Sequence, residues 1–136
     1  MSPVVALGFL QSTLAVDFFD RPVVIGVLFT VAAAVGAVAR HLVGQQLNGD
    51  FPTGTLLVNL VASLALGVIT SGPDPLPAVV GIGLLGALST WSTAAVEGAG
   101  MARRGEGALA AGYLGLSVTG GILAAWVGLQ IGPALF

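Results

Sequence analysis

The stretch GALSTWSTAAVEG, residues 86–98, decides how the fold of this chain is interpreted. The apolar run of residues 79–88 leads into it, and hydroxyl side chains and a tryptophan then precede a glutamate. Gly86 and the pair Ser89–Thr90 are poor helix formers. Non-helical backbone at membrane depth is stable only where it is buried in protein or lines a water-filled cavity. We therefore expect a helix interrupted between about Gly86 and Thr90, with freed carbonyls that can bind a cation.

The composition of the whole chain is that of a membrane protein. Of its 136 residues, 56% are hydrophobic and 7% are charged, whereas soluble domains carry about 25% charged residues. The net charge is −2, which gives no electrostatic basis for binding nucleic acid. Cysteine is absent, so disulfides, thiolate metal sites and cysteine nucleophiles are excluded. The 21 glycines favour close packing of helices in a bilayer.

Four apolar windows are long enough to cross a membrane, since about 20 residues are needed for a helix to span the hydrocarbon core. They cover residues 22–43, 52–71, 76–98 and 108–131. Short segments rich in turn-forming residues separate them, so consecutive spans are expected to be antiparallel. We predict an all-α membrane domain of four transmembrane helices over residues 22–136. Residues 1–21 form an N-terminal extension, expected to lie at the membrane interface.

The arginines leave the orientation of these spans open. Arg21 lies on one side of the expected bundle, Arg103 and Arg104 lie on the other, and Arg40 is near the end of the first window. Orientation follows the bias of Lys and Arg in short loops, and the bias here is small. A single orientation and insertion in both orientations are both compatible with this pattern.

Two stripes of polar or small residues recur at a spacing of four, which places each stripe on one helix face. They are Thr55, Asn59 and Ser63 in the second window and Tyr113, Ser117 and Gly121 in the fourth. Hydrogen bonds between helices are one interpretation, and the wall of a narrow polar path is the other. Asn59 favours a path, because its amide has two donors and an acceptor to satisfy at mid-membrane.

The available donors favour an anion as the solute. The stripes offer hydroxyls and one amide, and the ring edge of Trp91 is electropositive. Rings of carboxylates mark cation paths, and no carboxylate lies in the middle of an expected span. Glu97 falls near the expected end of the third span, where an interfacial carboxylate and a functional one are both possible.

Three segments of the chain resemble the Fluc (CrcB) family of fluoride channels. They are GAVARHLV at 36–43, FPTGTLLVNLVASLALG at 51–67 and GLLGALSTWSTAAVEG at 83–98. Their order across the spans makes the resemblance specific, although each segment alone would be weak. The resemblance implies an antiparallel, dual-topology dimer in the cell membrane. Two pores would conduct fluoride passively out of the cell and so relieve fluoride toxicity.

The resemblance also implies roles for individual residues. Gly86 and Ser89 match positions whose backbone carbonyls hold a structural Na⁺ at the dimer centre. Arg40 matches a buried arginine, which we interpret as structural and as a cap on a helix C-terminus. The implied fluoride path is made of the side chains of Asn59, Thr55, Trp91, Ser92, Thr93, Tyr113, Ser117 and Glu97.

The third of these segments departs from the family pattern at two positions, both of which are phenylalanine in the family. Trp91 stands at the first position and Ala94 at the second. A lost ring would leave space that water can fill. The chain would then conduct weakly as a homodimer, or serve as a non-conducting or half-functional subunit paired with a homologous partner.

Two other classes of function fit the sequence less well. A small multidrug-type exporter needs a carboxylate embedded in the membrane, and the first window contains none. An enzyme would need catalytic groups, but His41 is the sole histidine, and the spans contain neither paired carboxylates nor a Gly-x-Ser-x-Gly turn. We therefore predict a channel and not an enzyme.

Overall fold

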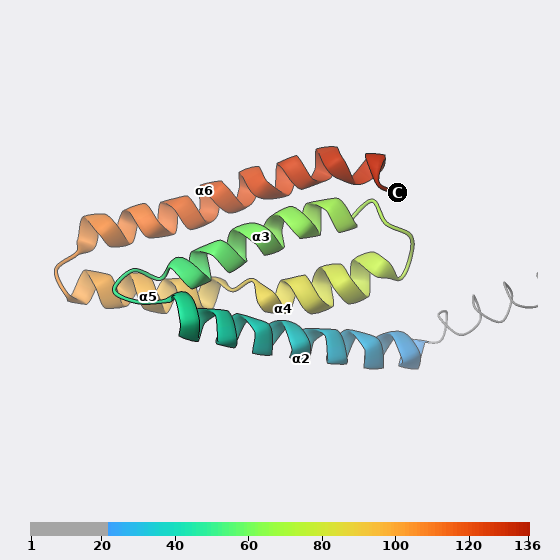
Figure 1. The fold of residues 1–136 in the computed structure, drawn as a ribbon, viewed down its shortest axis with the longest axis horizontal. Helices are drawn as coiled ribbons and strands as arrows, with labels where there is room; N and C mark the ends of the chain where they lie inside the picture. Colours follow the sequence, from blue (N-terminus) through green and yellow to red (C-terminus); the bar gives the residue numbers. More distant parts are fainter. Residues whose placement is uncertain (1–21) are drawn as a thin grey trace, which may run out of the picture.

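The computed structural model describes residues 22–136, and the interfacial extension expected for residues 1–21 lies outside this range. The described part is almost entirely helical, and its elements lie side by side along one long axis (Figure 1). In chain order they are α2 (Pro22–Leu47), α3 (Thr53–Ile69), the π-helical segment η1 (Pro77–Leu85), α4 (Gly86–Leu88), α5 (Trp91–Arg103), α6 (Gly107–Ile131) and the short 3₁₀ turn η2 (Gly132–Ala134).

The apolar windows of the sequence coincide with these helices. Within residues 22–136, three helical stretches are long and apolar enough to cross a membrane: Pro22–Leu47, Pro77–Arg103 and Gly107–Ala134. The second window forms Thr53–Ile69, an apolar helix of 17 residues. The prediction of an all-α protein with apolar, membrane-compatible helices is confirmed.

The turns between the helices are formed by residues that suit them. Pro77 lies in the first turn of η1, where a missing backbone N–H leaves no helical bond unmade. Gly105, between α5 and α6, has a φ of 85°, a left-handed conformation that glycine adopts without a steric penalty. These turns reverse the chain, so that successive helical stretches run in opposite directions (Figure 1).

The contact between α3 and α6 depends on two glycines that face each other. A Cβ atom at Gly67 would collide with the carbonyl of Ala125, and a Cβ atom at Gly128 would collide with the carbonyl of Leu64. The two backbones therefore touch directly, as small residues allow between membrane helices. This close approach brings the polar stripes of α3 and α6 together, and Gly121 lies against the hydroxyl of Ser63.

The backbone leaves helical geometry between α4 and α5. Ser89 (φ −74°, ψ 145°) and Thr90 (φ −152°, ψ 122°) are extended, and α5 begins at Trp91. Gly86, in contrast, is helical (φ −65°, ψ −35°), and the Ser89 N–H still donates to the Leu85 carbonyl at 2.9 Å. The extended segment is therefore two residues long. It begins at Ser89 and not at about Gly86, where the sequence analysis expects the interruption to begin.

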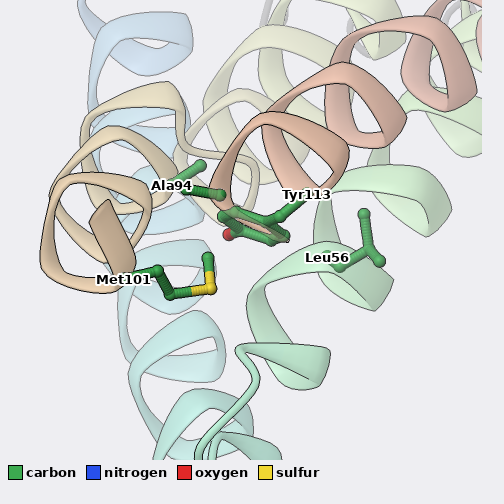
Figure 2. Packing of buried hydrophobic residues seen from close by; sticks show 5 residues of the cluster. Leu56, Ala94, Met101 and Tyr113 are labelled. Atoms are coloured by element: carbon green, nitrogen blue, oxygen red, sulfur yellow. The ribbon is translucent and has the colours of Figure 1, made fainter. Parts of the chain in front are cut away.

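The interior of the bundle is small, and most large apolar side chains lie outside it. A compact cluster of buried residues joins three helices (Figure 2) and contains Leu56, Ala94, Met101, Ala110 and Tyr113. By contrast, Val23, Val96 and Ile122 are each more than half exposed on the surface of the chain. An apolar surface of this extent needs to be covered by lipid or by another protein.

Candidate functional site

Asn59 of α3 supports the extended segment between α4 and α5. Its Oδ1 atom accepts hydrogen bonds from the Thr90 N–H at 2.7 Å and from the Ser89 hydroxyl at 3.1 Å. Its Nδ2 atom donates to the Thr90 carbonyl at 3.1 Å. Buried backbone groups need partners, and here one side-chain amide satisfies both groups of Thr90.

Hydroxyl groups gather at the start of α5. The Thr90 Oγ1 atom lies 3.0 Å from the Ser92 Oγ atom and donates to the Thr93 Oγ1 atom at 3.3 Å. It also accepts from the Thr93 N–H at 3.3 Å, which caps the helix. Because hydroxyls can rotate to donate or to accept, this cluster can turn O–H groups toward an anion.

Glu97, in the middle of α5, lies at the centre of a second network. Its Oε1 atom accepts from the Thr55 hydroxyl at 2.8 Å and from the Asn48 Nδ2 atom at 2.9 Å. Its Oε2 atom accepts from the Tyr113 hydroxyl at 2.7 Å. Three donors from three different segments thus converge on this carboxylate, which lies well before the end of α5 at Arg103.

The polar residues of α6 differ in their surroundings. The ring of Tyr113 is buried and meets the ring of Phe51 edge to face, with centroids 5.6 Å apart and an interplanar angle of 81°. Ser117 is also buried, but its hydroxyl donates to the Tyr113 carbonyl of its own helix at 2.8 Å. Such a bond satisfies a serine within its own helix, so Tyr113 is the residue of this pair that bridges to another helix.

Trp91 and Arg40 lie outside both networks. The Trp91 side chain is 59% exposed on the surface of this chain. Arg40 lines a pocket of about 370 Å³ together with His41, Asn48, Thr55 and Thr93. Arg40 lies within α2, which continues beyond it to Leu47, so its structural role as a cap on a helix C-terminus stays a prediction.

The water-filled space expected at Ala94 is not present. Ala94 has no exposed surface, and it packs beside the ring of Tyr113 (Figure 2). The expectation was wrong because the neighbouring helix fills the room, with Ala110 and Tyr113 of α6 in the same buried cluster.

Sequence reasoning missed two residues of these networks. Asn48 lies in a segment whose Asn-Gly pair is typical of a turn, and no helical periodicity connects it with Thr55 or Glu97. Thr90 belongs to the opening stretch, but its role depends on backbone groups that Asn59 reaches from another helix. In both cases the signal is in the tertiary contacts and not in the spacing of residues.

The fold and the site together define a class of protein. The chain is a helical membrane protein with an apolar exterior, and its interior holds two networks of hydrogen-bonded polar side chains that share the Thr55–Asn59 face of α3. Such polar residues within apolar helices mark paths for ions or polar solutes.

Residues 27–129 match the family described as "CrcB-like protein, Camphor Resistance (CrcB)". The chain belongs to this family.

Three relatives illustrate the similarity, and each is named as a fluoride-specific ion channel. FluC of Bordetella petrii is 43% identical over 115 residues, which cover 77% of this chain and 88% of the relative. FluC 1 of Symbiobacterium thermophilum is 41% identical over 119 residues, 78% of this chain and 95% of the relative. FluC 2 of Corynebacterium diphtheriae is 38% identical over 101 residues, 74% of this chain and 94% of the relative. These names confirm the predicted family and agree with a channel rather than an enzyme.

Proposed function

We propose that this chain is the subunit of a passive fluoride channel in the cell membrane, which lets fluoride leave the cell and so limits its toxicity. The observation that carries the proposal is the alignment of hydrogen-bond donors along α3 in a chain that belongs to the CrcB family. Thr55 and Asn59, one helical turn apart, bond to Glu97 and to Thr90 respectively. Fluoride is small and strongly hydrated, so a path for it must offer donors that replace its water.

The proposed path runs along this face of α3 past the start of α5. The hydroxyls of Ser92 and Thr93 and the amide of Asn59 are its donors near the extended segment. Thr55, Tyr113 and Glu97 form the network one turn further along. Ser117 is the least favourable member of the predicted set, because its hydroxyl bonds to its own helix.

We also propose that the four helical stretches all cross the membrane and that α4 and α5 are parts of one interrupted span. The unit would be an antiparallel, dual-topology dimer. Two features support an assembly. The single chain has an extensive apolar surface. Trp91 is exposed on this chain, so it could line a pore only if a partner subunit enclosed it. The buried packing of Ala94 favours a dimer of identical subunits. No empty space remains at this position that an aromatic ring of a different subunit would have to fill.

A structural Na⁺ at the dimer centre is a further part of the proposal. In a continuous helix the Gly86 carbonyl would accept from the N–H four residues later, which belongs to Thr90. That N–H is bonded to Asn59 instead, so the Gly86 carbonyl loses its usual donor. Carbonyl oxygens of this kind suit a cation, and Ser89, in extended conformation, adds another. If bound there, Na⁺ would supply positive charge that holds the two subunits together.

The test is a fluoride efflux assay on liposomes that contain only this purified chain. We expect efflux of fluoride well above that of protein-free liposomes, with much less efflux of chloride. Liposomes that retain fluoride would contradict the proposal for the lone chain. Restoration of efflux by a homologous second subunit would then favour the paired, heterodimeric alternative.

A further inference from the structure

The turn between α2 and α3 places the side chain of Asn48 between two pockets. The first is the pocket of about 370 Å³ that Arg40 and Thr93 line, and the second has a volume of about 140 Å³ and is lined by Glu97 and Arg104, among others. Asn48 lines both. Asn48 is thus a side chain that the two pockets share.

The two ends of this amide make different contacts. The Oδ1 atom accepts from the Thr55 N–H at 3.1 Å, one of the N–H groups in the first turns of α3 that lack a helical partner. The Nδ2 atom donates to the Thr55 hydroxyl at 2.9 Å and to the Glu97 Oε1 atom at 2.9 Å. The oxygen therefore supports the helix, while the nitrogen faces the polar network.

We propose that Asn48, the side chain that both pockets share, is a further donor of the fluoride path, and that its Nδ2 group is the part that an ion uses. The inference rests on the proposed channel function and adds a residue to its path. An anion that moves directly between the pockets passes the Glu97 carboxylate, which repels it. Donors beside the carboxylate offset this repulsion. Asn48 and Thr55 both line the first pocket, and both donate to Glu97.

The competing explanation is a purely structural role, in which Asn48 only supports the start of α3. The substitution Asn48→Asp separates the two roles. Aspartate has nearly the same shape and is as good a partner as asparagine for N–H groups at a helix start, so the bond to the Thr55 N–H is retained. It replaces the N–H₂ donor by an oxygen that only accepts. A structural role predicts normal flux, and a role in the path predicts a folded protein with little flux.

The experiment measures fluoride efflux from liposomes and thermal unfolding in detergent for the full chain. We expect Asn48→Asp to lower efflux about tenfold or more, because hydrogen bonds to ions are among the stronger ones. We also expect a folded protein with a lower unfolding temperature, because the new carboxylate replaces the group that donates to Glu97 at 2.9 Å and repels that carboxylate. The matched control is Gln46→Glu, the same change of amide to carboxylate on α2. Gln46 is exposed and lines neither pocket, so this variant should keep wild-type efflux.

Each outcome decides the proposal. Wild-type efflux from folded Asn48→Asp overturns it, and so does an equal loss in Gln46→Glu, which would show a general effect of charge. If Asn48→Asp does not fold, Asn48→Ser decides, since serine also caps helices but lacks the amide. A folded Asn48→Ser variant with wild-type efflux, or failure of both variants to fold, leaves only a structural role. The proposed function fails separately, if the wild type itself does not conduct.

Discussion

Asn59 of α3 pairs with both backbone groups of Thr90: it accepts the Thr90 N–H at 2.7 Å and donates to the Thr90 carbonyl at 3.1 Å. A side-chain amide carries the same donor and acceptor as a peptide group, so Asn59 substitutes for the helical partners that an extended residue lacks. The same contact diverts the N–H that the Gly86 carbonyl would otherwise use. One residue thus stabilises the interruption and leaves a carbonyl available beside it.

The substitution Asn59→Asp should abolish fluoride efflux. It keeps the acceptor for the Thr90 N–H, removes the donor to the Thr90 carbonyl, and adds a negative charge on the proposed route of an anion. We expect a folded protein, less stable by about 1–3 kcal/mol because a buried carbonyl loses its partner. Efflux from liposomes and thermal unfolding in detergent measure the two effects.

The matched control for Asn59 is Ser63→Ala, on the same face of α3 but one turn further along. Serine can bond to its own helix backbone, so the loss of this hydroxyl should change efflux by less than the loss at Asn59. Undiminished efflux from folded Asn59→Asp would mean that the face of α3 is a packing surface and that the path lies elsewhere.

The substitution Tyr113→Phe tests the Glu97 network. It removes the hydroxyl that donates to the Glu97 Oε2 atom at 2.7 Å and keeps the ring that packs against Phe51. Hydrogen bonds to charged groups contribute about 1.5–3 kcal/mol, so the Glu97 carboxylate should be less firmly fixed in position. We expect the efflux rate to fall by about tenfold. An efflux assay at equal protein density in the liposomes measures this change. Wild-type rates would show that the hydroxyl is not needed for conduction.

The substitution Gly67→Ala tests the direct contact between α3 and α6. The added methyl group would meet the backbone of α6, and overpacking of this kind destabilises by about 1–3 kcal/mol. The matched control is Gly112→Ala on α6, where nothing lies within 4 Å of an added Cβ atom. We expect a lower unfolding temperature for the first variant. For the second we expect an unchanged or slightly higher one, because alanine favours helix by about 1 kcal/mol.

The sequence predicted the helices well and the site only in part, for physical reasons that individual residues illustrate. Long apolar windows set the helices, so the range expected for the last span, 108–131, differs by one residue from the observed start of α6 at Gly107. The spacing of Thr55 and Asn59 predicted a shared face, which both networks use. The partner of each donor could not be predicted, because Asn48 and Glu97 meet only through packing of the bundle. The same limit explains the error at Ala94, whose surroundings are set by α6.

The last prediction concerns Ala94, where the family pattern has a phenylalanine. From the sequence alone, Ala94→Phe would be expected to fill a vacancy and raise efflux. The structure reverses this expectation, because Ala94 has no exposed surface and lies beside the ring of Tyr113 in the buried cluster (Figure 2). A phenyl ring there must displace the Tyr113 ring, and overpacking a filled core destabilises by about 1–3 kcal/mol. Displacement of Tyr113 would also break its bond to Glu97, so we expect both the unfolding temperature and the efflux to fall.

The matched control for Ala94→Phe is Ala99→Phe, at an exposed position of the same helix, which should leave the cluster intact. Higher efflux from a stable Ala94→Phe variant would show that the cluster can open to admit the ring and that the position still faces the path.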